Sequence, residues 1–467
     1  MIDASVAQVL GRLPFDVGLP LLAEVNEAEL GPLVLAAVLL SLIVVYLSAK
    51  LGGELCARIN LPPVLGELVG GVIVGVSALH LIVFPEGGMA PGSVLMDFMQ
   101  MTGGLEEDAI AAIFNSQSEV ISVLAEIGVV ILLFEIGLES DLKELIRVGP
   151  QAAVVAIIGV VVPFAAGTAG LIAIFNIATV PAVFAGAALT ATSIGITAKV
   201  LAELQQLSSK EGQIIIGAAV LDDVLGIIVL AVVASLAKTG EIEITNVISL
   251  VVSAAAFLIG AILIGRLISP IFVSIVDQLR TRGQVLISSL IFAFVLAYIA
   301  AAIQLEAILG AFAAGLILAE TSKRKELEEQ ISPVADMRVP VFFVVVGART
   351  DISVLNPLEP ANREGLIIAS FLVVIAIIGK IITGFAVFGQ PGINRWAIGI
   401  GMIPRGEVGL VFAGVGAASG VLSESLDAAI IVMVILTTFV APPLLRVVFQ
   451  SDDDAGQPTV EEASVQS

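Results

Sequence analysis

Two adjacent aspartates, Asp222 and Asp223, are the residues of this 467-residue chain that most clearly point to chemistry. They lie near the middle of the unbroken apolar stretch IIIGAAVLDDVLGIIVLAVVASLA, which is long enough to cross a bilayer. A charged side chain at the bilayer centre costs about 2.5–3.5 kcal/mol on insertion scales, and neighbouring carboxylates also repel each other. Paired charges, bound cations or exchangeable protons make such a site tolerable. The pair therefore predicts a site where a transported cation competes with protons.

Lys380 is the expected counter-charge, because it lies well inside the apolar stretch SFLVVIAIIGKIITGFAVF. Neighbouring helix positions point about 100° apart, so Asp222 and Asp223 should perform different tasks. We expect one carboxylate to face an ion cavity and the other to face a neighbouring helix. Two other interpretations stay open: acids held by salt bridges of purely structural value, and a Lys380 side chain that extends to the inner surface.

Two apolar stretches have helix-breaking centres. AGAALTATSIGITAKV contains Thr190, Thr192 and Ser193, and AIGIGMIPRGEVGLVFAG contains Arg405 and Glu407. Unwound middles expose carbonyls and helix ends that coordinate a cation or offset its charge. The hydroxyls of Thr192 and Ser193 would add oxygen ligands, which a hard cation prefers. An internal Arg405–Glu407 pair of structural value fits the second stretch equally well.

The composition sets the class of protein that holds these residues. The chain is 58% hydrophobic and 13% charged, with a mean hydropathy of +1.09, which is typical of a polytopic helical membrane protein. A net charge of −21 argues against nucleic acid as a partner. No motif for an enzyme or a cofactor is present, so we expect neither. We predict thirteen membrane spans: 31–50, 62–84, 120–138, 150–175, 180–202, 211–237, 245–269, 283–302, 305–320, 334–349, 364–388, 395–418 and 425–449.

The halves of the chain contain an inverted repeat. LPPVLGELVGGVIVG (61–75) matches LEAILGAFAAGLILA (305–319), and LLFEIGLESDL (132–142) matches FFVVVGARTDI (342–352). An odd number of spans separates the copies, so they cross the membrane in opposite directions. Such repeats are typical of secondary transporters, with the substrate site near the midplane. Most of the 21 Lys and Arg residues fall on loops of one side, which predicts a cytoplasmic C-terminus.

Five motifs together resemble the monovalent cation:proton antiporter-2 (CPA2) family, particularly its NapA/GerN-like Na⁺/H⁺ antiporters. They are LFEIGLESDL, LTATSIGITAKVL, LDDVLGIIVLA, FFVVVGARTD and MIPRGEVGLVFAG, and the resemblance runs from about residue 31 to 449. Length and an acidic insertion are similar to cyanobacterial members. The resemblance implies an all-α fold of about thirteen transmembrane helices with inverted repeats and two crossed discontinuous helices. It also implies a homodimer and an elevator-like movement of a core domain.

Carried over residue by residue, the resemblance makes Asp223 the principal carrier of cation and proton. Asp222 becomes the partner of Lys380, both aspartates become ligands of the transported Na⁺, and Thr190 to Ser193 line the crossing. The implied divisions are an N-terminal segment (1–30), an antiporter domain (31–449) and an acidic tail (450–467). Within the domain we expect a core (120–237 and 364–449), a dimer or scaffold part (31–84 and 245–349) and an acidic insertion (85–119).

The predicted activity is exchange of Na⁺, or Li⁺, for H⁺ by alternating access, with a net charge moved in each cycle. Potassium/proton exchange, a cation channel and an ion sensor are the alternatives. Too few residues follow the last predicted span for a nucleotide-binding regulatory domain. The sequence predicts an integral membrane protein of a plasma or an internal membrane such as a thylakoid. Glu67, Glu126 and Glu135 are further acids, which we interpret as gate or pH-sensing groups or as ordinary helix-end acids.

Overall fold

The computed structural model describes residues 27–85, 92–103, 105–239, 244–358, 360–389 and 391–456. Every regular element within these ranges is a helix, which confirms the predicted all-α class. Most of the predicted N-terminal segment and of the acidic tail lies outside the described residues. The helices are α2 (Glu27–Arg58), α3 (Pro63–Val74), α4 (Val94–Gly103), α5 (Glu107–Glu139), α6 (Leu142–Arg147), α7 (Gly149–Phe175), α8 (Thr179–Ala188), α9 (Ile194–Glu203), α10 (Lys210–Thr239), α11 (Ile244–Gln278), α12 (Gln284–Ala302), α13 (Ala307–Ala319), α14 (Arg324–Ala348), η1 (Ile352–Leu355), α15 (Pro360–Phe385), α16 (Arg395–Gly401), α17 (Glu407–Ala418) and α18 (Glu424–Gly456).

A helix or a pair of half-helices lies in each of the thirteen predicted spans. In the described part of the chain, nine helices are long and apolar enough to cross a membrane. The shorter apolar helices α3 and α13 lie in two further predicted spans. The last two are interrupted helices, α8 followed by α9 and α16 followed by α17. The chain is therefore a multi-pass membrane protein.

Two boundaries differ from the prediction. Helix α3 ends at Val74, although residues 62–84 were expected to form one span, and the chain then turns through His80 with φ of 50°. Helix α5 begins at Glu107 rather than near residue 120. Its first turn carries Glu107 and Asp108, whose charges complement the positive end of the helix dipole. Part of the expected acidic insertion is therefore helix.

The inverted repeat is visible in two equivalent helix crossings. A Cβ on Gly71 of α3 would lie 2.9 Å from the Cα of Gly347 in α14, and a Cβ on Gly137 of α5 would lie 3.1 Å from the Cα of Gly315 in α13. Gly71 matches Gly315 and Gly137 matches Gly347 in the aligned repeats. Both crossings therefore depend on the same pair of repeat positions, where the backbones approach too closely for a side chain.

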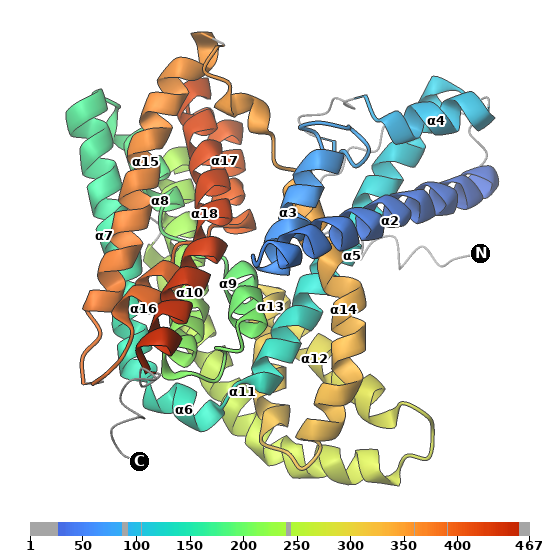
Figure 1. The fold of residues 1–467 in the computed structure, drawn as a ribbon, viewed down its shortest axis with the longest axis vertical. Coiled ribbons are helices and arrows are strands. Elements are labelled where there is room, and N and C mark those ends of the chain that lie inside the picture. Colours follow the sequence, from blue (N-terminus) through green and yellow to red (C-terminus); the bar gives the residue numbers. More distant parts are fainter. Residues whose placement is uncertain are drawn as a thin grey trace, which may run out of the picture.

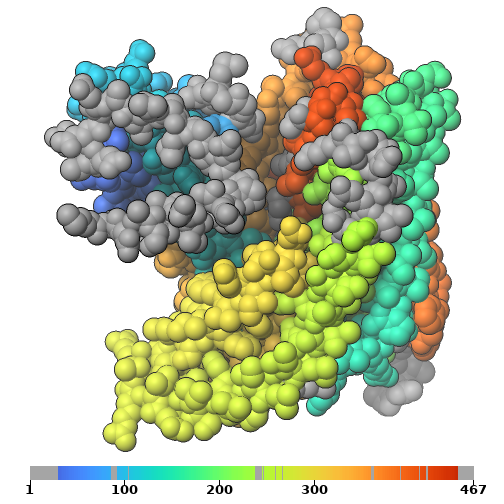
Figure 2. All heavy atoms as spheres, turned by 180° about the vertical axis from the view of Figure 1, so that it is seen from behind, coloured from blue at the N-terminus to red at the C-terminus, as the bar shows by residue number. Residues whose placement is uncertain are grey.

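The helices form two bundles (Figure 1). The core bundle consists of α7–α10 and α15–α18, and the scaffold bundle consists of α2, α3, α5 and α12–α14. Helix α11 packs on α10 and also on α12 and α13, so it joins the two. Figure 2 shows the opposite face, across which α11 and α12 run in yellow-green and yellow. Helix α5 packs mainly on α13 and α14, so the structure groups residues 120–138 with the scaffold and not with the core.

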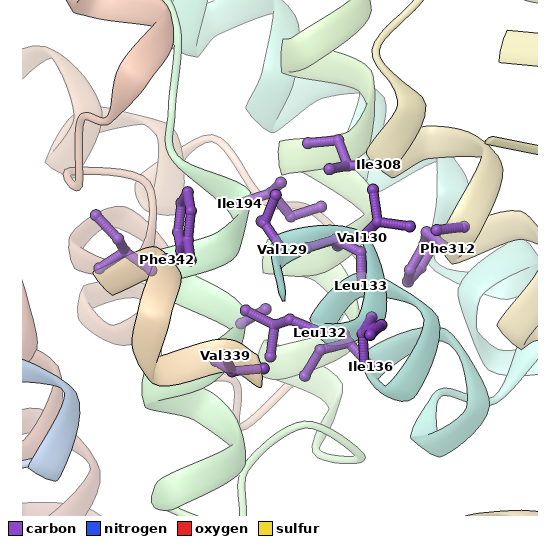
Figure 3. Packing of buried hydrophobic residues seen from close by; sticks show 14 of the residues in the cluster. Val129, Val130, Leu132, Leu133, Ile136, Ile194, Ile308, Phe312, Val339 and Phe342 are labelled. Carbon is purple, nitrogen blue, oxygen red and sulfur yellow. The ribbon is translucent and has the colours of Figure 1, made fainter. Parts of the chain in front are cut away.

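The seam between the bundles is apolar where α9 meets α5 and α14. A Cβ on Gly195 would lie 3.4 Å from Val129 Cγ2 and 3.5 Å from Phe342 Cε1, so small and large residues fit together there. Figure 3 shows this packing, with Ile194 of α9 above the side chains of α5. The labelled residues around it are Val129, Val130, Leu132, Leu133, Ile136, Ile308, Phe312, Val339 and Phe342.

Candidate functional site

The two interrupted helices cross at their breaks. Residues 189–193 separate α8 from α9, and residues 402–406 separate α16 from α17. Pro404 has no backbone N–H to donate, so a helix cannot continue regularly through it. The backbone N–H of Ser193 donates to the carbonyl of Pro404 at 2.8 Å, and Thr192 Oγ1 donates to the carbonyl of Met402 at 3.2 Å. Each break therefore supplies polar partners to the other.

Two threonines outside the predicted site residues complete this crossing. Thr197 Oγ1 of α9 donates to the carbonyl of Gly401 at 2.9 Å, which satisfies one of the last carbonyls of α16. Thr438 Oγ1 of α18 donates to the carbonyl of Arg405. Thr197 lies one helical turn after Ser193, and this spacing was a usable signal. No local feature of the sequence distinguishes Thr438 from other threonines in apolar helices.

Helix α10 carries the paired aspartates to the crossing. It packs against all four half-helices, α8, α9, α16 and α17. Asp222 is fully buried and Asp223 is 2% exposed. The backbone of α10 is an ordinary helix here, so the two side chains point in different directions, as expected.

Lys380 of α15 is fully buried beside Asp222. Its Nζ lies 3.0 Å from Asp222 Oδ2 and donates a second hydrogen bond, of 2.8 Å, to the carbonyl of Thr190. The ammonium thus joins α15, α10 and the first break. A small residue makes room for it, since a Cβ on Gly159 of α7 would lie 3.1 Å from Nζ.

Buried oxygens are present for a hard monovalent cation. Asp222 Oδ1 and Ser193 Oγ are buried and have no hydrogen-bond partner among the described residues. Thr190 Oγ1 and Thr192 Oγ1 are already donors to carbonyls, to that of Ala187 and that of Met402 respectively. Their lone pairs remain for a cation, because a hydroxyl donates one hydrogen bond and accepts two. Such oxygens fit Na⁺ better than a soft metal.

Arg405 is the second buried cation of the crossing. It is fully buried, and its Nη1 donates to the carbonyl of Ala191. The side chain of Glu407 lies outside the described residues, so the expected Arg405–Glu407 pair is not described; the backbone of Glu407 begins α17. Gly406 lets the breaks approach, since a Cβ there would lie 2.6 Å from Ser193 Oγ.

The further acids of the sequence analysis are separate from the crossing. Glu135 of α5 accepts a hydrogen bond of 2.9 Å from Ser332 Oγ of α14, within the scaffold bundle. Glu67 of α3 lines a cavity of about 320 Å³ between α2, α3 and α14, together with Lys50 and Asp336. Glu126 is exposed. None of the three has a described hydrogen bond to a residue of the crossing.

The sequence comparisons agree on one family. The family described as "Sodium/hydrogen exchanger, transmembrane" matches residues 38–450. The chain is 69% identical over 426 residues to the high-affinity Na⁺/H⁺ antiporter NhaS3 of Synechocystis sp., covering 91% of this chain and 92% of that protein. It is 33% identical over 416 residues to the Na⁺/H⁺-K⁺ antiporter GerN of Bacillus cereus, covering 88% and 96%.

A solved structure has a similar fold. The sodium proton antiporter MjNhaP1 of Methanocaldococcus jannaschii, determined at pH 8, superposes with a TM-score of 0.57 at 16% identity. The match covers 88% of this chain and 96% of that one. At this identity the likeness supports the fold alone, and it agrees with the predicted antiporter architecture.

Proposed function

Because the chain belongs to the sodium/hydrogen exchanger family, we propose that it is a secondary transporter that exchanges Na⁺ for H⁺ across a membrane. One observation carries the proposal to particular residues. Two buried aspartates on one helix lie against two crossed helix breaks, and a buried lysine forms an ion pair with Asp222. A buried carboxylate group of this kind binds either protons or a small cation.

In the proposed cycle Asp223 carries the ion. Na⁺ binds to Asp223, Asp222 and the oxygens of Thr190, Thr192 and Ser193 when the site faces one side. Protons from the other side displace it, and the Lys380–Asp222 pair holds the site closed while the core bundle moves against the scaffold bundle. One site serves both substrates, so exchange is obligatory. If two protons move for each Na⁺, one net charge crosses, worth about 2.3 kcal/mol per 100 mV.

The experiment is exchange in proteoliposomes. A pH gradient is imposed, a fluorescent pH reporter is enclosed, and Na⁺, Li⁺ or K⁺ is added outside. Na⁺ is expected to collapse the gradient in the wild type and to have no effect in Asp223→Asn. The matched control is Asp97→Asn, which makes the same chemical change at an exposed position of α4. Na⁺-dependent proton movement retained by folded Asp223→Asn would contradict the assignment.

The same assay distinguishes Na⁺/H⁺ exchange from K⁺/H⁺ exchange. A relative of this chain is named as a Na⁺/H⁺-K⁺ antiporter, so transport of K⁺ has a specific basis. Collapse of the gradient by K⁺ alone would make the protein a K⁺/H⁺ exchanger. Dissipation by any added cation without dependence on Asp223 would indicate a channel.

Three finer properties belong to the same proposal. The protein acts as a homodimer, its C-terminus lies on the cytoplasmic side, and it resides in a plasma or thylakoid-type membrane. The dimer rests on the family resemblance, and the orientation rests on the distribution of Lys and Arg over the loops. Cross-linking in native membranes tests the first, and protease access to a C-terminal tag tests the second.

A further inference from the structure

Four charged side chains are buried in the described part of the chain: Asp222, Asp223, Lys380 and Arg405. Two are acidic and two are basic, so the site is electrically neutral when all four are ionised. Lys380 has an obvious partner in Asp222, with which it forms an ion pair of 3.0 Å. Arg405 forms no ion pair within 4.0 Å among the described residues, and this buried charge therefore needs another explanation.

Arg405 and Lys380 each donate a hydrogen bond to a backbone carbonyl of the first break. Lys380 donates to the carbonyl of Thr190, and Arg405 donates to the next carbonyl, that of Ala191. These carbonyls follow the C-terminus of α8, which is the negative end of its dipole. Two positive charges therefore lie beside the oxygens that would otherwise attract a cation. Arg405 also interacts electrostatically with Asp222.

The guanidinium group has donors that are not used for positioning. Its Nε and Nη2 are buried and have no hydrogen-bond partner among the described residues. A structural arginine normally uses its planar fork for paired hydrogen bonds to a carboxylate. Arg405 makes one described hydrogen bond, to a carbonyl, so its main contribution to the site is its charge. Arginine also keeps that charge at any physiological pH.

We propose that Arg405 is a positioning residue that sets the cation affinity of the site, as a fixed positive charge that keeps the empty site neutral. This inference rests on the proposed Na⁺/H⁺ exchange. A neutral empty site attracts Na⁺ through its oxygen ligands but not through a net charge, so the ion is held weakly enough to be released. Without Arg405 the empty site would be negative by one unit and would hold Na⁺ too tightly.

The expected signature is a joint decrease of KM and kcat. Removing one unit of charge from a partly polar interior should lower the KM for Na⁺ by about tenfold. Release becomes slower, so kcat should fall as well. A merely structural role of Arg405 would disorder the ligands, and it would raise KM or reduce the amount of active protein.

The test uses Arg405→Gln, which keeps a hydrogen-bond donor for the Ala191 carbonyl but removes the charge, and Arg405→Lys, which keeps the charge. The matched control is Arg58→Gln, at an exposed residue of α2. Initial exchange rates are measured over a range of Na⁺ concentrations in proteoliposomes. We expect a lower KM and a lower kcat in Arg405→Gln, values near wild type in Arg405→Lys, and no change in the control.

A second comparison applies if Arg405→Gln alone does not fold. While Lys380 is protonated, Asp222→Asn makes the empty site positive by one unit, and Asp222→Asn with Arg405→Gln makes it neutral again, so the two are compared near pH 6. The double variant should bind Na⁺ about tenfold more tightly than Asp222→Asn, as measured by calorimetry in detergent. Equal affinities, or weaker binding in the double variant, would overturn the inference. An unchanged or raised KM in folded Arg405→Gln would do so as well. If the wild type shows no Na⁺-dependent proton movement, the proposed function itself fails.

Discussion

Removing one member of the Lys380–Asp222 pair should cost much more stability than removing both. Both side chains are fully buried, and Nζ and Oδ2 are 3.0 Å apart. Lys380→Met leaves the Asp222 carboxylate buried, and Asp222→Asn leaves the ammonium with the Thr190 carbonyl as its remaining described acceptor. Breaking a buried pair from one side costs about 3–5 kcal/mol. Replacing both partners by uncharged groups of similar volume is often close to neutral.

The cost of each single change has a ceiling, because the remaining group can become neutral. Protonating an aspartate at pH 7 costs about 4 kcal/mol, and deprotonating a lysine costs about 5 kcal/mol, from their ordinary values in water. These ceilings agree with the range for a broken pair. They also give the two variants opposite pH dependence. In Lys380→Met the buried Asp222 carboxylate becomes neutral by taking up a proton, so the loss of stability shrinks as the pH falls. In Asp222→Asn the buried Lys380 ammonium becomes neutral by losing a proton, so the loss of stability shrinks as the pH rises.

The assay is thermal unfolding of the wild type, both single variants and the double variant in one detergent, near pH 6 and near pH 9. The double variant should unfold closer to the wild type than either single variant does. Lys380→Met should be the less stable single variant relative to wild type at the higher pH, and Asp222→Asn at the lower pH. Additive losses in the double variant, or the same pH trend in both single variants, would refute the reasoning.

Two further variants test the crossing and the repeat. Ser193→Ala removes a buried hydroxyl that has no described partner. It should therefore raise the KM for Na⁺ several-fold while the thermal midpoint stays constant. The control is Ser41→Ala, at a buried serine that is hydrogen-bonded within α2, and it should change neither the KM nor the thermal midpoint. Gly71→Ala should lower the thermal midpoint by several degrees, because its Cβ would meet the backbone of Gly347, whereas Gly260→Ala in α11 has open space and should be neutral or stabilising. An equal effect of the two substitutions in either pair would contradict the geometry.

Hydropathy and motif spacing predicted much of this fold, because membrane spans must satisfy their backbone internally. The positions of the helices and both helix breaks follow from runs of apolar residues and from the prolines and glycines that interrupt them. The aligned repeats also placed Asp141 and Asp351 at the same position. In the structure Asp141 accepts from two backbone N–H groups at the start of α6, and Asp351 accepts from one at the start of η1.

Packing partners were harder to predict than the spans themselves. Residues 120–138 precede the core helices in sequence, yet α5 packs mainly on α13 and α14. The reason is close approach at glycines: a Cβ on Gly128 would lie 2.6 Å from the Arg338 carbonyl oxygen. A glycine that permits such contact is indistinguishable, in one sequence, from a glycine that faces open space. The hydrogen bonds of Thr197 and Thr438 were missed for a related reason, because their acceptors are backbone carbonyls, which every residue carries.

The two bundles are held by different kinds of contact, and the difference bears on how the site could move. The described hydrogen bonds of Thr192, Thr197, Lys380 and Arg405 all join helices of the core bundle. Directional bonds of this kind resist relative movement, so the crossing should travel as one rigid unit. The seam at α9 instead consists largely of apolar contacts, which have no preferred direction.

One polar contact does cross the seam among the described residues near α9. The N–H of Val64 in α3 lies 3.5 Å from Glu203 Oε2 at the end of α9, a long and weak hydrogen bond. A core bundle that slid along the scaffold would give up this bond and exchange one set of apolar neighbours for another. The hydrogen bonds around the ion site would stay intact. This distribution of contacts favours movement of the whole site over rearrangement within it, since the second route would break several buried hydrogen bonds at once.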